Sequence, residues 1–134
     1  MTDRRIVITG IGVISPLGND LASTWEAMKA GRSGIDTIKS MDVTGYSTKI
    51  AGEVKDFDPA PYFKTPKDAR RVDRFTHFAM GAAGMALKDS GMDLEAVDKT
   101  RIGVMVGSGI GGLGTLSGPI VGAAIVVALA AVVG

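Results

Sequence analysis

The chain has 134 residues, a formal net charge of +1, no cysteine and a single histidine, His77. This length suits one modest domain, and the balanced charge provides no global field that would attract nucleic acid. Without cysteine the chain has no disulfide, thiolate metal site or cysteine nucleophile, and one histidine excludes a histidine-rich metal cluster. The N-terminal residues lack the apolar stretch of a secretory signal, so we expect a cytoplasmic protein.

The first element is predicted to be a strand over residues 5–15, which are almost continuously apolar and suit burial on both faces. Pro16 and Gly18 should end it. Gly10 and Gly12 begin a dinucleotide fingerprint but do not complete it, because Ser15 stands where the third glycine belongs. No nucleotide cofactor is therefore expected here.

A packing helix is predicted over residues 20–30, capped by Asp20 or Ser23 and stopped by Gly31. Its apolar residues share one face, which we expect to be buried: Leu21, Trp25 and Met28. Residues 33–48 have the composition of a loop, and residues 49–54 of a short strand.

The longest predicted helix spans residues 66–90, with Thr65 as its N-cap, Pro66 at its first position and Gly91 at its end. After it, the apolar run 102–106 predicts a short buried strand that enters a glycine-rich loop, residues 107–114. Glycines there would let the backbone pass close to other backbone or to a ligand. The order strand, helix, strand, helix, strand predicts an α/β fold.

Four cations cluster at the start of the long helix, where they oppose the helix dipole at a cost of roughly 0.3–1 kcal/mol each. They are Lys67, Arg70, Arg71 and Arg74. A basic cluster at an unfavourable place suggests an acidic partner, and the alternative is a solvated face with local ion pairs. His77 follows Asp73 by four residues, so a helical Asp–His pair is the corresponding hypothesis there.

The glycine loop matches the letters of a dinucleotide motif, but no helix is predicted to open there and no acidic residue follows. Ser108 does not sit in a nucleophile elbow, because Val106 stands where the first glycine should be.

Residues 102–134 carry no charge, and the end of the chain is almost purely aliphatic. Three interpretations of this tail stay open: a buried helix or strand pair, a membrane segment, or an artificial or frame-altered end. Fifteen apolar residues as helix span only about 22 Å, short of a bilayer core of about 30 Å.

These segments together resemble the β-ketoacyl-acyl-carrier-protein synthases, the condensing enzymes of fatty acid synthesis. The resemblance covers about residues 3–116 and rests on several segments in the family's order and spacing: 4–18, 23–26, 31–35, 56–57, 67–75, 89–91 and 107–112. It implies part of the first half of a thiolase-like α/β fold, a homodimer, and decarboxylative condensation of an acyl thioester with malonyl-carrier protein. The domain boundaries expected from it are 1–116 for the synthase segment and 117–134 for an apolar tail outside the family.

The resemblance also assigns roles to particular residues. Ile110 matches an isoleucine that lines the acyl-chain pocket, and Lys67, Arg70 and Arg71 match a basic patch that meets the acyl carrier protein. The family's catalytic cysteine and two histidines belong to segments further along, and His77 matches neither histidine. We therefore expect no catalytic residue, metal or cofactor in this chain, and no activity by the chain alone. The alternatives are a carrier-protein-binding module and a membrane-associated fragment.

Overall fold

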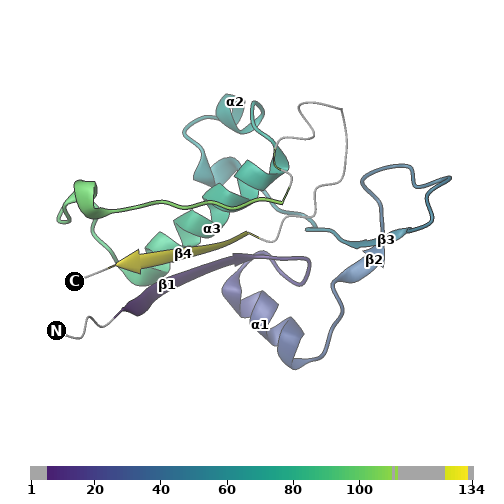
Figure 1. The fold of residues 1–134 in the computed structure, drawn as a ribbon, viewed down its shortest axis with the longest axis horizontal. Helices are drawn as coiled ribbons and strands as arrows, with labels where there is room; N and C mark the ends of the chain where they lie inside the picture. Colours follow the sequence, from purple (N-terminus) through teal and green to yellow (C-terminus); the bar gives the residue numbers. More distant parts are fainter. Residues whose placement is uncertain (1–5, 110, 112–125, 133–134) are drawn as a thin grey trace.

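The structure is a computed structural model that describes residues 6–109, 111 and 126–132 (Figure 1). Its elements in chain order are β1 (Val7–Ile14), α1 (Leu21–Lys29), β2 (Ile35–Thr37), β3 (Ile50–Gly52), the 3-10 turn η1 (Ala60–Tyr62), α2 (Pro66–Ala69), α3 (Arg74–Ser90), the 3-10 turn η2 (Lys99–Arg101) and β4 (Val126–Val132). Helices and strands are thus mixed, as the α/β prediction requires. Both two-stranded sheets, β1–β4 and β2–β3, are antiparallel.

The centre of the fold is the contact between β1 and α3, which lies across the β1–β4 pair (Figure 1). Gly10 and Gly12 make this contact close: a Cβ on Gly12 would overlap the carbonyl oxygen of Ala82, and one on Gly10 that of Ala86. These two glycines therefore allow a strand and a helix to meet backbone to backbone.

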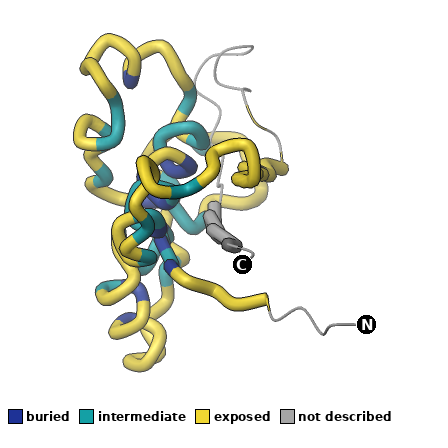
Figure 2. Tube along the Cα trace, turned by 90° about the vertical axis from the view of Figure 1, so that its left-hand side faces the viewer, coloured by how far each residue is buried: buried dark blue, intermediate teal, exposed yellow. Residues whose placement is uncertain are grey.

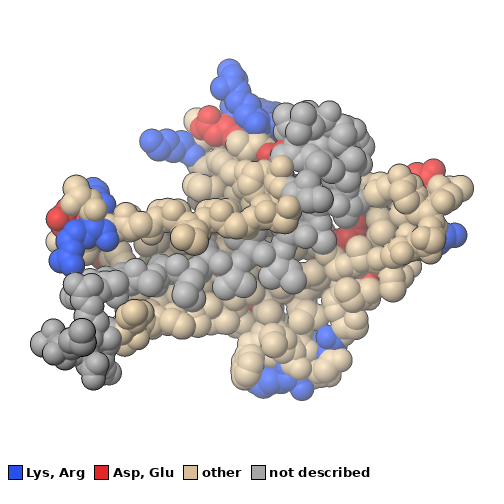
Figure 3. Space-filling model, in the orientation of Figure 1, with Lys and Arg blue, Asp and Glu red and all other residues tan. Residues whose placement is uncertain are grey.

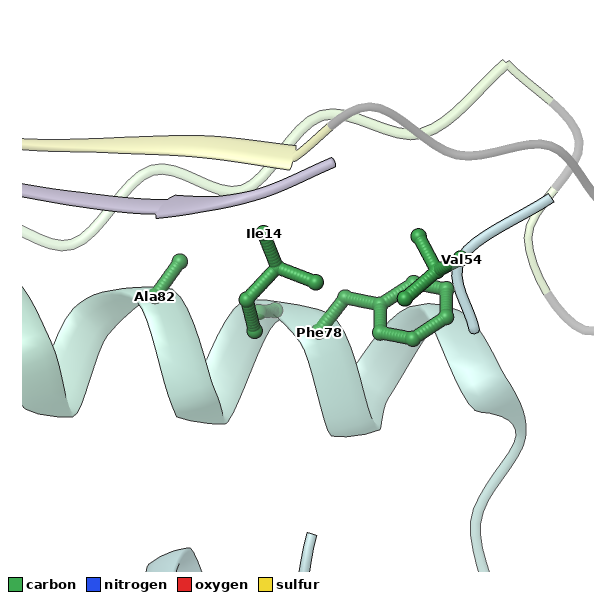
Figure 4. Close-up of a cluster of buried hydrophobic side chains, with 5 residues drawn as sticks. Ile14, Val54, Phe78 and Ala82 are labelled. Carbon is green, nitrogen blue, oxygen red and sulfur yellow. The ribbon is translucent and has the colours of Figure 1, made fainter. Parts of the chain in front are cut away.

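A small hydrophobic core fills the end of this interface. Ile14 is fully buried and points from β1 toward α3, where Phe78 and Ala82 lie, with Val54 closing the side (Figure 4). Burial of such an aliphatic side chain stabilises a fold by about 1.5–3 kcal/mol. The other end of β1 is open, with Ile6 and Ile8 exposed near the N-terminus (Figure 2). The prediction of a strand buried on both faces is wrong for that half, because no second layer covers it in the described part of the chain.

The helix predicted over residues 20–30 is confirmed as α1, with Asp20 as its N-cap and Gly31 just beyond its end at φ +63°. Its predicted inner face is wrong: Leu21, Trp25 and Met28 are exposed, and the buried residues are Thr24 and Ala27. The Thr24 hydroxyl lies 3.2 Å from the Gly18 carbonyl oxygen and 3.1 Å from the Ser15 hydroxyl. These hydrogen bonds hold the small, polar side of the helix against the turn that follows β1.

The long helix predicted over residues 66–90 is two helices. Thr65 caps α2 and Gly91 ends α3 in the left-handed conformation, as predicted, but the chain turns between Ala69 and Arg74. Asp73 has an extended backbone, with ψ at 162°, and this starts a second helix axis. Apolar residues recur at helical spacing on both sides of this break, so their periodicity did not reveal it.

The strands differ most from the prediction. Residues 50–52 form a strand as expected, but they pair with β2, which lies in the predicted loop. Residues 102–106 are not a strand: Val104 is 85% and Met105 96% exposed. The strand that pairs with β1 is β4, with Gly12 opposite Ala128. This pairing places residues 126–132 of the tail in a strand, one of the three interpretations.

Within the residues that the structure describes, no helix is long and apolar enough to cross a membrane.

Candidate functional site

Exposed cations gather around α2, and Lys and Arg side chains project from this part of the surface (Figure 3). We name Lys67, Arg70 and Arg71 the basic cluster. All three are exposed, and in the described part of the chain no salt bridge joins any of them to an acid. The alternative interpretation was a solvated face with local ion pairs. The structure shows no such ion pair at these three residues.

The local sequence explains how the helical turn beneath the basic cluster is formed. The Thr65 hydroxyl accepts a hydrogen bond from the Asp68 backbone N–H at 3.3 Å and donates one to the Asp68 carboxylate at 2.8 Å, which closes the first turn. Lys67 lies within α2, Arg70 is its C-cap and Arg71 follows directly, so three exposed cations stand within five residues of the chain. The cluster is a compact set of exposed positive charges that suits an anionic surface.

Arg74, the fourth predicted cation, is held differently. Its Nη2 atom donates to the Val54 carbonyl oxygen at 2.8 Å, and its guanidinium lies 5.2 Å from the centroid of the Phe78 ring. A cation over an aromatic face is attracted by the ring quadrupole. Arg74 thus fastens α3 to the segment after β3 and is not a mobile docking cation.

His77 contacts α2, which sequence reasoning missed. Its Nε2 atom lies 2.7 Å from the carbonyl oxygen of Ala69, and its ring meets Phe63 edge to face. The hypothesis of a helical Asp–His pair is not supported at Nε2, which bonds to the Ala69 carbonyl, although the His77 backbone N–H bonds to the Asp73 carbonyl at 3.3 Å. No sequence pattern predicts a hydrogen bond between a histidine side chain and the backbone carbonyl eight residues earlier.

A shallow cavity of about 250 Å³ lies beside this junction. Its lining is Val54, Asp56, Phe57, Pro59, Arg74, His77 and Phe78. Ligand pockets are commonly about 300–1,000 Å³ and present several convergent polar groups. Three ionisable side chains line this cavity: the Arg74 guanidinium and the His77 imidazole, which bond to backbone carbonyls, and the Asp56 carboxylate.

The described glycines of the predicted loop differ in how closely other atoms approach them. A Cβ on Gly107 or Gly109 would meet nothing within 4 Å, whereas one on Gly111 would lie 3.3 Å from the Phe75 ring. Ile110, the predicted acyl-pocket residue, lies outside the described residues. Among those described, no three His, Asp or Glu side chains could hold a metal ion together.

Comparison with known proteins places the chain in a family. The model of the family described as "Beta-ketoacyl synthase, N-terminal domain" matches residues 3–126. The chain belongs to the β-ketoacyl synthase family, as the resemblance predicted.

Among curated relatives, the chain is 48% identical over 113 residues to 3-oxoacyl-[acyl-carrier-protein] synthase 2 of Vibrio cholerae. It is 47% identical to the proteins of that name from Coxiella burnetii and Staphylococcus aureus. Each alignment covers 84% of this chain but 27% of the relative. The chain therefore spans about a quarter of the length of these relatives.

Two solved structures resemble the fold. One is the ishigamide ketosynthase/chain length factor, with a TM-score of 0.62 and 36% identity over 70% of this chain and 23% of that one. The other is a type II polyketide ketosynthase, AntDE, in complex with its acyl carrier protein, with a TM-score of 0.58 and 28% identity over 79% of this chain and 26% of that one. The mixed helix and strand architecture is thus that of part of a ketosynthase.

Proposed function

We propose that this chain is the N-terminal part of a condensing enzyme of fatty acid biosynthesis and supplies its docking surface for the acyl carrier protein. The complete enzyme would join an acyl thioester to malonyl-carrier protein with loss of carbon dioxide. The family membership and the names of the relatives support this assignment. In the finer form of the proposal, residues 1–116 form the first part of the N-terminal half of a thiolase-like fold. Residues 117–134 are an apolar tail, of which residues 126–132 pair with β1.

The basic cluster is the observation that carries the docking role. Three exposed cations lie on and directly after a capped turn, and no acid of the described chain forms a salt bridge with them. A partner with an acidic surface would be steered to this place and oriented by it, more than it would be held by raw affinity. The carrier protein bound to the similar ketosynthase AntDE makes an acyl carrier protein the natural candidate.

The remaining assignments follow from the same proposal. Ile110 would line the acyl-chain pocket of the complete enzyme. A homodimer and a cytoplasmic location are expected for such an enzyme. Acyl transfer in this family needs a thiol, and the chain has no cysteine. Its own contribution is therefore binding.

The docking role is tested by measuring affinity for purified acyl carrier protein at several salt concentrations. The triple variant Lys67→Ala, Arg70→Ala, Arg71→Ala should bind at least about tenfold more weakly and with a weaker salt dependence, because it presents fewer charges. The control variant Arg32→Ala, Lys49→Ala, Lys88→Ala removes the same net charge from exposed sites outside α2. Equal loss in both variants, or no binding by the unaltered chain, would refute a specific docking site.

A further inference from the structure

One side chain holds α2 from both sides. The His77 ring sits in the first turn of α3, yet it contacts Phe63, just before α2, and Ala69, the last residue of α2. The ring centroids of His77 and Phe63 are 5.7 Å apart, with the ring planes at 88°. The imidazole therefore joins α3 to the entry and to the exit of the shorter helix.

The Ala69 contact also fixes where the ring carries its proton. A carbonyl oxygen only accepts hydrogen bonds, so the Nε2 atom at 2.7 Å must be the donor. The Ala69 carbonyl is one of the last of α2, and carbonyls at this end of a helix have no partner within the helix. His77 supplies the missing donor.

These contacts from outside α2 matter because the helix is a single turn of four residues. Nucleating a turn costs more conformational entropy than its few hydrogen bonds return, so isolated short helices are unstable. The bonds of α2 itself are long: Ala69 N–H to the Thr65 carbonyl at 3.5 Å and Arg70 N–H to the Pro66 carbonyl at 3.3 Å. Contacts with the rest of the fold must keep this turn in place.

We propose that His77 is a positioning residue for the basic cluster. Arg70 and Arg71 directly follow the carbonyl that His77 holds, so a shift of that carbonyl moves both guanidinium groups relative to Lys67. By clamping α2 onto α3, the imidazole fixes the backbone that carries the three charges before a partner arrives. A preorganised surface binds more tightly because less ordering remains to be done on association. This inference rests on the proposed docking function.

The clamp is tested first in the free chain, by amide hydrogen exchange at Ala69, Arg70 and Arg71. His77→Leu removes the donor and should raise exchange at these amides about tenfold, the effect of losing one hydrogen bond. His77→Gln keeps an N–H donor but loses the ring that meets Phe63, so exchange at these amides should rise less than in the leucine variant. Lys88→Gln, at an exposed site near the other end of α3, is the control and should change nothing at α2. Unchanged exchange in the leucine variant would overturn the clamp.

A second measurement connects the clamp to docking. His77→Leu should weaken binding to purified acyl carrier protein about three- to tenfold with an unchanged salt dependence, because all three charges remain. His77→Gln, which keeps the donor but not the ring, should restore part of the affinity. Failure of the unaltered chain to bind would overturn the docking function and the positioning role together. Normal binding by the unaltered chain, with equal affinity in the leucine variant, would overturn the positioning role alone.

A third variant guards against loss of the whole fold in His77→Leu, which would appear as fast exchange at Phe78 and Ala82. Phe63→Leu leaves the hydrogen bond and removes the aromatic half of the clamp. It should raise exchange at the same three amides of α2. A folded Phe63→Leu chain with unchanged exchange would count against the clamp.

Discussion

Gly12 of β1 lies so close to the Ala82 carbonyl of α3 that no other residue type fits there without displacing the backbone. The strand and the helix supply most of the core, so their separation sets the packing of Ile14 and Phe78. The pair Gly12–Ala82 thus determines how the β1–α3 layer is built.

We therefore expect Gly12→Ala to lower the free energy of unfolding by about 1–3 kcal/mol or more, the usual cost of overpacking a close contact. Gly103→Ala is the matched control, because a Cβ at that position meets nothing within 4 Å. Urea denaturation followed by circular dichroism measures both. Equal stabilities of the two variants would show that β1 and α3 can separate at no cost.

A second prediction concerns the core residue on the same strand. Ile14→Ala should lower the free energy of unfolding by about 2–5 kcal/mol, because it removes buried methyl groups and leaves a cavity beside Phe78. Ile8→Ala makes the same chemical change at a side chain that is 59% exposed, and should stay within about 0.5 kcal/mol of the unaltered chain. Denaturant titrations of both variants test whether the core sits where the structure places it.

A third prediction concerns pH and the N-cap of α1. The Asp20 carboxylate accepts a hydrogen bond from the Ser23 backbone N–H at 2.7 Å, and this bond lowers the pKa of Asp20 from its ordinary value of 3.8. A depressed pKa means that ionised Asp20 favours the folded chain. Its contribution is complete above pH 3.8 and is lost as the pH falls through the lower value of the folded state.

Asp20→Ala should accordingly destabilise the chain by about 1 kcal/mol near neutral pH, with the difference shrinking below pH 3.8. Asp20→Asn keeps a side-chain oxygen that caps the helix, so it should preserve most of the stability and remove this part of the pH dependence. Unfolding curves from about pH 3 to about pH 7 provide the comparison. A constant stability difference between the unaltered chain and the Asp20→Ala variant across that range would contradict the role of the ionised cap.

The sequence predicted local features such as helix caps better than it predicted which segments pack or pair with each other. The caps at Asp20, Thr65 and Gly91 depend on neighbouring residues alone, and all three are present in the structure. The inner face of α1 was misassigned, because hydrogen bonds from Thr24 to the turn after β1 outweigh the apolar stripe. The strand predicted over residues 102–106 is also absent, and β4 pairs with β1. Residues 102–106 have the composition of a buried strand, but pairing is decided by which distant segment reaches the edge.

The candidate site likewise has residues that the sequence singled out and a contact that it did not predict. Charge spacing singled out four cations, Lys67, Arg70, Arg71 and Arg74, and the resemblance assigned a carrier-protein contact to the first three, which stays a prediction. The hold that His77 exerts on Ala69 could not be predicted, because it depends on a break between α2 and α3 that apolar periodicity does not reveal. Every residue has a backbone carbonyl, so the residue type does not show which carbonyl accepts a hydrogen bond. Such contacts can be identified only from a three-dimensional structure.

The last prediction concerns catalysis by the 134-residue chain itself. In this family a cysteine thiol takes the acyl group from the carrier protein, and this chain has no thiol with which to form such an intermediate. Mixed with acyl- and malonyl-acyl carrier protein, it should give no 3-oxoacyl product above the background without protein, even where it binds the carrier protein. The Vibrio cholerae synthase, which is similar over this region and much longer, is the positive control. Product formed by a homogeneous preparation of the chain would mean that a group other than a thiol accepts the acyl chain. The exposed hydroxyl of Ser108 would then be the first side chain to replace.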